Sequence, residues 1–361
     1  MSPICLKSSA RALFAGALLL GAASGALAQQ AARKPDTMTA TPRFVVLPGT
    51  HPEAVKSALA AGSTLTTWDF KYTYKGNNYS DIFVGNAPTG KKTTTPAFII
   101  PIKIVLSTGQ TFSTSTMQAN GQTALADTVA SPIYQSVISF KEGAAKLGRT
   151  QYEDAFQRES FWTDVTANPK YHVLLGAPTV LPEMTLNVPA ASGHIGSEFG
   201  VTVALVDINY LDGQVNAIIR ANSQITGGTV PVFELYDTYE TSGGCCIGGY
   251  HSATGAQSYA VFDYIGTPGA FSQDVSALSH EMGEWLDDPF TTNNSPCGIY
   301  ETGDPLEREA NYGGYPYVTN GMTYNLQDLA QPPYFGAPPA GTLKGRATFQ
   351  GTKLSVCQNG A

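Results

Sequence analysis

The stretch that most constrains the fold of this chain is residues 279–289, which read SHEMGEWLDDP. On an α-helix, His280 and Glu284 would lie one turn apart on the same face, with Glu281 beside them. An imidazole and carboxylates that converge in this way can hold a divalent metal ion. The remaining chain must therefore supply the elements that cover this polar helix and complete its site.

The local sequence predicts where this helix begins and ends. Ser272 is a suitable N-cap, Asp274 would stand in the first turn, where the helix dipole favours an anion, and Pro289 ends the run. Gly283 costs about 1 kcal/mol in a helix interior, so we expect a close backbone approach there. The residues that form an apolar stripe at helical spacing are Val275, Leu278, Met282, Trp285 and Leu286.

The spacing is a variant of the His-Glu-x-x-His motif of zinc peptidases. In that motif two histidines hold the metal ion, and the intervening glutamate takes a proton from the attacking water. Here Glu284 stands in place of the second histidine, and Glu281 is the expected general base. The alternative is a surface helix on which His280 and both glutamates face water.

The segment after the helix supplies further candidates. Residues 299–305 read IYETGDP, and the helix motif followed by Glu301-x-x-Asp304 resembles the gluzincin, or thermolysin-like, plan. That resemblance implies that Glu301 is the third metal ligand and that Asp304 orients His280 through a hydrogen bond. Asp304 comes one residue earlier than in the thermolysin pattern. Asp288 is a rival third ligand, because it follows His280 by two turns on the same helix.

The same residues support a second resemblance. The Ser-His-Glu-x-x-Glu-x-x-x-Asp-Pro signature is similar to that of exported bacterial proteins and, more loosely, of the plant EXORDIUM, or phosphate-induced, proteins. The likeness covers roughly residues 240–335, including YNLQDL at 324–329. It implies a zinc-dependent hydrolase, and we expect a peptidase that acts on peptide or protein substrates. An oxygen-rich site would also accept Ca²⁺ or Mn²⁺.

Two more residues are candidates for transition-state support. His251 follows a Gly-Cys loop and is either a metal ligand or a donor to a developing oxyanion. Tyr300, next to Glu301, is the other candidate donor. The predicted strand 258–264 precedes the metal helix, like the strand that holds extended substrate in zincin-like folds.

The N-terminus predicts export. Residues 1–28 read as a secretory signal peptide, with Lys7 and Arg11 before an apolar core and Ala-Leu-Ala at its end. No later stretch approaches the ~18 apolar residues of a transmembrane helix. We therefore expect a secreted or periplasmic protein that is free of the membrane after cleavage, with a disordered leader at 29–42.

The cysteines then fall in an oxidising compartment. Cys245, Cys246, Cys297 and Cys357 remain after cleavage, and two disulfides are the default. Because adjacent cysteines bridge each other only with strain, we expect Cys245 and Cys246 to pair with Cys297 and Cys357 in one order or the other. A cysteine-rich metal site is disfavoured, because the C-x-x-C spacing is absent.

Composition and periodicity predict an α+β fold. Charged residues make up only 14% of the chain, and the formal net charge of −7 becomes −9 without Lys7 and Arg11, which argues against nucleic acid or an anionic membrane as partner. We expect a β-rich scaffold at 43–240 and a zincin-like catalytic region at 241–361. Strands are predicted at 43–47, 67–84 (a hairpin), 96–106, 201–205 and 230–235, and a helix at 151–162.

Some expectations concern single residues of that scaffold. Pro101 suggests an edge or a bulge in strand 96–106. We expect Asp154, Arg158 and Glu159 to form a solvated face of the helix 151–162, His172 to be a half-buried strand residue and His194 to lie in a loop. The remaining alternative for the whole chain is a secreted binding or cell-surface protein with a structural or vestigial metal site.

Overall fold

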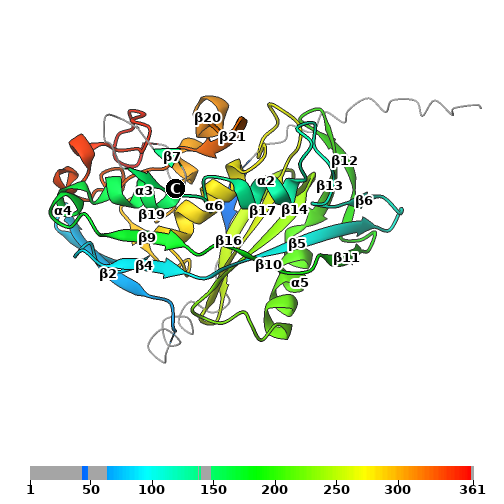
Figure 1. Ribbon diagram of the computed structural model, residues 1–361, viewed down its shortest axis with the longest axis horizontal. Helices are drawn as coiled ribbons and strands as arrows, with labels where there is room; N and C mark the ends of the chain where they lie inside the picture. Colours follow the sequence, from blue (N-terminus) through cyan, green and yellow to red (C-terminus); the bar gives the residue numbers. More distant parts are fainter. Residues whose placement is uncertain (1–42, 48–62, 137, 140–147, 359–361) are drawn as a thin grey trace, which may run out of the picture. The chain divides into compact units, whose positions relative to one another are not determined.

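The computed structural model describes residues 43–47, 63–136, 138–139 and 148–358. The described residues all belong to one compact unit. The predicted signal peptide and leader lie outside the described residues. The fold mixes helices and strands, as predicted, and one curled sheet dominates it (Figure 1).

This sheet has eleven strands in the described part of the chain, and neighbouring strands run parallel at some pairs and antiparallel at others. Strands from both expected regions, 43–240 and 241–361, take part in it. The main path is β10 (Thr179–Val180), β5 (Ala97–Leu106), β14 (Val230–Tyr236), β17 (Gln257–Tyr264), β16 (Ile247–Thr254), β15 (Thr238–Thr241), β13 (Val201–Asp207) and β12 (Gly193–Glu198). The strands off this path are β1 (Arg43–Val46) beside β16, and β11 (Met184–Val188) and β6 (Thr111–Phe112) beside β5.

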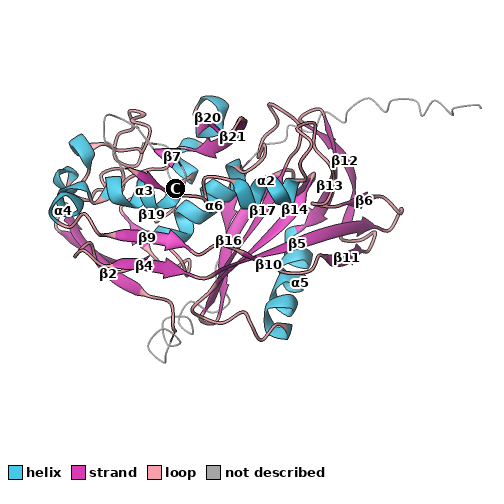
Figure 2. Cartoon of the chain, in the orientation of Figure 1, coloured by secondary structure: helices cyan, strands magenta, loops and turns pink. Residues whose placement is uncertain are grey.

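Smaller strand pairs and the helices surround this sheet (Figure 2). The pairs are β2 (Thr67–Tyr74) with β3 (Asn77–Val84), β4 (Lys92–Thr95) with β9 (His172–Leu175), β7 (Ile138–Ser139) with β8 (Arg149–Thr150), β18 (Asn294–Ser295) with β19 (Gly298–Ile299), and β20 (Gly314–Thr319) with β21 (Met322–Gln327). The helices are α2 (Ala124–Ala130), α3 (Tyr152–Ser160), α4 (Trp162–Ala167), α5 (Ile208–Ala221) and α6 (Ser276–Asp287), and the 3₁₀ turns are Asp304–Leu306, Ala310–Gly313, Pro339–Gly341 and Leu343–Gly345.

Each face of the sheet packs against a different helix. Alternating side chains of β17 point to opposite faces, so that Phe262 joins the core around α6 while Val261 joins the core around α5. The α6 core includes Met282 and Trp285, both of which are fully buried. This two-sided burial explains the apolar runs at residues 230–233 in β14 and 259–262 in β17.

The helix α6 differs from its prediction at its start. It begins at Ser276, and Val275 occupies the N-cap position. The hydroxyl of Ser272 instead donates to the carbonyl of Asp263 (2.8 Å), and the carbonyl of Gly248 lies 3.3 Å from it. The helix ends at Asp287, before Pro289, as predicted. All its residues from Ala277 to Asp287 are buried, so the surface-helix alternative is wrong.

Gly283 is explained by a side chain and not by a backbone. A Cβ atom at this position would lie 2.5 Å from Cδ1 of Leu329. The glycine thus lets the segment after β21 pack directly on α6.

Several predictions about the scaffold need correction. Strand β5 is not an edge, because β10 and β11 pair with one side of it and β14 and β6 with the other. Pro101 lies at the point along β5 where β10 gives way to β11 and β14 gives way to β6. Strand β17 is central, between β14 and β16, so it has no free edge to hold extended substrate. His194 lies in β12 and not in a loop.

The helix expected at 151–162 is present as α3 followed by α4, but its charged residues are not solvated. Asp154, Arg158 and Glu159 are all buried. The predicted hairpin is present as β2 and β3, and His172 is a half-buried residue of β9, as predicted.

The expected disulfide pairing is wrong. Cys245 bonds to Cys246, and Cys297 bonds to Cys357. The first pair lies in the turn between β15 and β16, whereas Cys297 lies in the turn between β18 and β19, where the C-terminal segment passes beside it with a Cα–Cα distance of 4.9 Å. Among the described helices, none has the length and apolar character needed to cross a membrane.

Candidate metal centre

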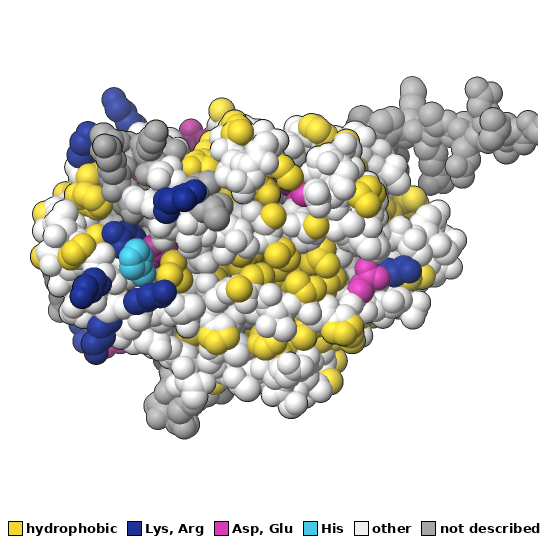
Figure 3. Space-filling model, in the orientation of Figure 1, with side chains coloured by type: hydrophobic (Ala, Val, Ile, Leu, Met, Phe, Trp, Pro, Cys, Tyr) yellow, Lys and Arg dark blue, Asp and Glu magenta, His cyan; other side chains and the backbone are white. Residues whose placement is uncertain are grey.

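The predicted site residues come from three segments that meet at α6. His280, Glu281 and Glu284 belong to α6, His251 to β16, and Glu301 and Asp304 to the segment after β19. Figure 3 shows few acidic side chains on the face it presents, because many carboxylates of this chain are buried. Of the site side chains, Asp304 is the most exposed, at 21%.

The first group of possible ligands consists of His251, Glu281 and Glu284, whose ligand atoms lie within 4.8 Å of one another. The Nδ1 atom of His251 is 3.4 Å from Oε2 of Glu281 and 3.4 Å from Oε2 of Glu284. Gly249 makes room for this group, since a Cβ atom there would lie 3.0 Å from Oε1 of Glu281. The glycine-rich start of β16 therefore has a steric reason.

The second group consists of His280, Asp304 and Glu307. The Nε2 atom of His280 is 3.4 Å from Oδ1 of Asp304 and 3.0 Å from Oε1 of Glu284. Asp304 thus lies beside His280, as expected, but at the ring nitrogen that also faces Glu284, and neither nitrogen of His280 has a hydrogen-bond partner among the described residues; its orienting role stays a prediction. Gly303 is required beside it, because a Cβ atom there would lie 2.3 Å from Nδ1 of His280.

Glu284 stands between the two groups. Its Oε1 atom accepts hydrogen bonds from the amides of Gly303 (3.0 Å) and Asp304 (3.2 Å) and faces His280. Its Oε2 atom faces His251 and has no hydrogen-bond partner among the described residues. The carboxylate that replaces the second motif histidine is thus the point at which both histidines meet.

The other predicted residues lie nearby in different surroundings. Glu301 places Oε2 3.8 Å from Nε2 of His251, on the side of the imidazole away from Glu281. Its role as third ligand stays a prediction. The carboxylate of Asp288 accepts the amides of Thr292 (2.9 Å) and Asn293 (3.1 Å), so it supports the turn after α6.

Tyr300 is a core residue in this structure. Its ring stacks on Phe335 with centroids 3.9 Å apart, and its hydroxyl has no hydrogen-bond partner among the described residues. Phe44 of β1 packs against His280, and the centroids of the two rings are 4.0 Å apart.

Burial and charge shift the pKa values of the cluster in opposite directions. Burial alone would lower the pKa of His251, but its contacts with Glu281 and Glu284 raise it to about 10. Burial likewise opposes the charged form of His280, yet Glu284 and Asp304 hold its pKa well above the usual range. The neighbouring carboxylates thus favour the protonated form of both imidazoles.

The carboxyl groups respond according to their neighbours. Burial raises the pKa of Glu281 to about 7, against the contact with His251. Burial would raise that of Glu284 too, but the two histidines lower it below its usual value. For Glu301, burial and the nearby charge of Glu284 both raise the pKa.

The cluster holds more carboxylates than the protein provides cations for. Within the described residues, none of the ion pairs joins a lysine or an arginine to any of its acidic side chains. Buried carboxylates without a partner either take up protons or bind a cation. Because imidazole and carboxylate groups are suitable ligands for Zn²⁺ and Mn²⁺, these residues can hold a metal ion.

A third group, Glu198 with Cys245 and Cys246, is chemically different. Both sulfur atoms are in a disulfide, so neither is a thiolate ligand. Glu307 is the residue of the site that the sequence interpretation missed. The repeat Glu301-x-x-Asp304-x-x-Glu307 was the available signal.

Comparisons with known proteins add no assignment: no protein-family model, no curated protein and no solved structure matches this chain.

Proposed function

We propose that this chain is a metal-dependent hydrolase that cleaves peptide bonds. The observation that carries the proposal is the convergence of His251 and His280 on the two oxygens of Glu284, beside Glu281, in a cluster with an excess of carboxylates. Such a cluster has its strongest physical explanation in a bound cation. A chain with the predicted signal peptide would meet peptides outside the cytoplasm.

In this proposal zinc is held by His280 and Glu284, with Glu301 as third ligand and Asp304 orienting the imidazole. Zn²⁺ in such a site supplies Lewis-acid chemistry that polarises a carbonyl group and acidifies water. Glu281 takes the proton from the attacking water, a task favoured by a pKa of about 7. His251 lies 3.4 Å from Glu281 and can stabilise the negative charge that develops.

The test begins with the metal content of the purified protein, measured by inductively coupled plasma mass spectrometry. We expect near-stoichiometric zinc, lost in Glu284→Ala. Glu281→Gln should retain the metal and lose at least about a hundredfold in hydrolysis of a peptide library. Glu234→Gln is the matched control, because Glu234 is an equally buried glutamate, on β14, that forms no part of the cluster. A metal-loaded wild type without hydrolysis would overturn the enzymatic proposal.

A second function is favoured by one observation: the side chains of His251 and Glu281 are 0% exposed and that of Glu284 is 1% exposed. A closed group of this kind suits a structural metal. The chain would then be a secreted binding or cell-surface protein. Under this alternative Glu281 is a ligand, so Glu281→Gln lowers the metal content, and neither the wild type nor the variant hydrolyses peptides; Mn²⁺ or Ca²⁺ in place of zinc would favour it further.

A further inference from the structure

The third group of possible ligands, Glu198 with Cys245 and Cys246, shares no residue with the candidate metal centre. Its three ligand atoms lie within 4.8 Å of one another. Glu198 is the last residue of β12, and the two cysteines lie in the turn between β15 and β16. The fold therefore brings a carboxylate from a distant segment to a pair of adjacent sulfur atoms.

The disulfide between Cys245 and Cys246 has no strong structural explanation. A disulfide stabilises a protein mainly by constraining the unfolded chain, and the effect grows with the number of residues between the two cysteines. The sequence separation is 1 for Cys245 and Cys246, but it is 60 for Cys297 and Cys357. The second disulfide thus serves the stability of the fold, whereas the first calls for a chemical explanation.

The backbone holds the adjacent cysteines in place without the bond between them. The carbonyl of Cys246 accepts the amide of Arg43 in β1 (3.1 Å). Ile247, the next residue, pairs with Glu240 of β15. Two thiols formed by reduction of the disulfide would therefore stay beside each other and beside Glu198.

The group is accessible from solvent on one side. Glu198 and Cys245 are partly exposed, and Gly243 and Gly244 before Cys245 are exposed. Cys246 is 1% exposed, so a reductant approaches from the side of Cys245. None of the ion pairs among the described residues includes Glu198, and its carboxylate is therefore available as a ligand.

We propose that reduction of this disulfide creates a binding site for a thiophilic divalent cation, Zn²⁺ or Cd²⁺, held by the thiolates of Cys245 and Cys246 and the carboxylate of Glu198. In the reduction, a dithiol donor gives two electrons and two protons, so that the S–S bond breaks, two thiols form and the donor becomes a disulfide. The cation then displaces the two thiol protons.

The ligand set decides which cations fit. Thiolates select soft cations, whereas Ca²⁺ and Mg²⁺ prefer sites made of oxygen atoms alone. Three protein ligands also leave the fourth position of a tetrahedral ion for water. The C-x-x-C spacing of many zinc sites is absent, and the carboxylate of Glu198 completes the set instead. The proposal does not depend on the candidate metal centre or on hydrolysis.

The test uses Cd²⁺ as the probe, because thiolate ligands give this ion an ultraviolet charge-transfer absorption that nitrogen and oxygen ligands do not give. The full chain is reduced with a phosphine, separated from the reductant and titrated with cadmium chloride in the absence of oxygen. We expect the absorption to appear with a single Cd²⁺ per reduced chain and to be absent from the oxidised chain. The ligands of the candidate metal centre contain no sulfur, so that centre does not contribute to the signal.

Variants of the cysteines and of Glu198 locate the site. The double substitution of Cys245→Ser with Cys246→Ser should abolish the absorption. Cys297→Ser with Cys357→Ser is the matched control and should retain it, because no third ligand joins that pair among the described residues. Glu198→Gln should weaken Cd²⁺ binding by at least about tenfold, an effect seen even for groups that only support a metal ligand.

A measurement on the wild type keeps the test decisive if the double variants do not fold. Cd²⁺ should protect Cys245 of the reduced chain from alkylation by iodoacetamide, while Cys297 and Cys357 remain reactive, as read by peptide mass spectrometry. Four results would overturn the proposal: no absorption in the reduced wild type, an absorption that survives the loss of Cys245 and Cys246, protection confined to Cys297 and Cys357, or unchanged affinity in Glu198→Gln.

Discussion

Two buried helices of this protein, α3 and α6, both carry charged residues, but they differ in whether those residues have ion-pair partners. On α3, Asp154 accepts the amide of Val173 (2.7 Å) and pairs with His172 (2.8 Å), and Glu159 pairs with Arg346 (3.2 Å). On α6, no lysine or arginine within the described residues pairs with Glu281 or Glu284.

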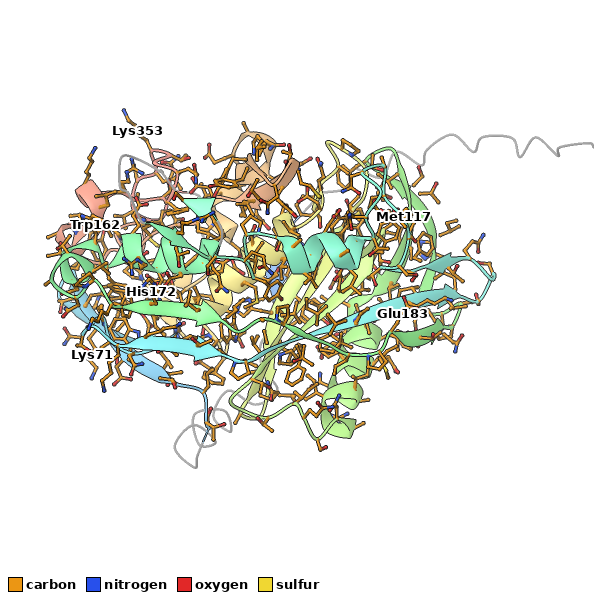
Figure 4. All side chains as sticks on the ribbon, viewed as in Figure 1. Lys71, Met117, Trp162, His172, Glu183 and Lys353 are labelled. Carbon is orange, nitrogen blue, oxygen red and sulfur yellow. A yellow bond between two sulfur atoms is a disulfide. The ribbon has the colours of Figure 1, made fainter. Side chains whose placement is uncertain are left out.

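The difference separates two reasons for burying charge. Asp154 and Glu159 of α3 have ion-pair partners within the chain, on β9 (His172, labelled in Figure 4) and in the C-terminal segment (Arg346). The cluster of α6 is incomplete, because its carboxylates outnumber its imidazoles. We therefore interpret α3 as structural and α6 as a ligand-binding helix, and the predictions below test that contrast.

The largest effect is expected from chelation. Consider protein in a free metal concentration about a thousandfold above Kd. Removal of that metal by EDTA should lower the free energy of unfolding by about 4 kcal/mol. Urea unfolding followed by tryptophan fluorescence, with and without EDTA, measures this change. Glu284→Ala should be insensitive to EDTA, whereas Asp154→Ala should remain as sensitive as the wild type. An EDTA-insensitive wild type would mean that α6, like α3, is complete without a cation.

The second effect concerns α3 itself. Asp154→Ala should lower the free energy of unfolding by about 3 kcal/mol, because it leaves the buried amide of Val173 without an acceptor and His172 without its partner. Metal content should not change. Asp164→Ala on α4 is the control, since Asp164 is exposed and its loss should cost little. Loss of metal in Asp154→Ala would show that the two helices are not independent.

The contrast between the helices also marks what the sequence could predict. Apolar alternation correctly placed β1, the β2–β3 hairpin, β13 and β14, because strand periodicity is a local property. Helical spacing likewise predicted that Asp154, Arg158 and Glu159 form a solvated face of α3, which is wrong. The partners that bury its charges, His172 and Arg346, come from distant parts of the chain, and helical spacing does not reveal them.

For a similar reason, only part of the candidate metal site could be predicted from the sequence. The residues His280, Glu281 and Glu284 follow from spacing on one helix. His251 was named from its loop, and the structure brings it to Glu284. Glu307 was missed, because its position depends on how the segment after β19 folds back over His280, with Gly303 leaving room for the ring.

The third effect depends on pH. Glu153 is the one charged residue of α3 whose carboxylate oxygens both lack a hydrogen-bond partner in the described chain. Burial, reinforced by the charge of Asp287, raises its pKa well above 4.5. The folded chain therefore keeps this proton where the unfolded chain has lost it, and stability falls as pH rises from about 4.5 through the folded pKa.

Glu153→Gln removes this titration. Within that window, the stability difference between variant and wild type should grow by about 1.4 kcal/mol per pH unit in favour of the variant, and it should vanish below pH 4. Urea unfolding at a series of pH values measures the difference, and Glu183→Gln at an exposed position is the control. A difference that does not change with pH would place an unseen partner beside Glu153.

The smallest effect is expected from Tyr300→Phe, which defines where the α6 site ends. The ring of Tyr300 is fully buried between Phe335 and Phe83, and its hydroxyl has no hydrogen-bond partner among the described residues. Removing an unsatisfied buried hydroxyl should leave stability unchanged or raise it by up to about 1 kcal/mol. Metal content and hydrolysis should stay as in the wild type, because the ring packing that positions the neighbouring Glu301 is retained. A loss of turnover of about a hundredfold, with the metal still bound, would contradict this prediction. Tyr300 would then be a transition-state donor that reaches the substrate only in the complex. The site would in that case extend beyond the residues that contact Glu284.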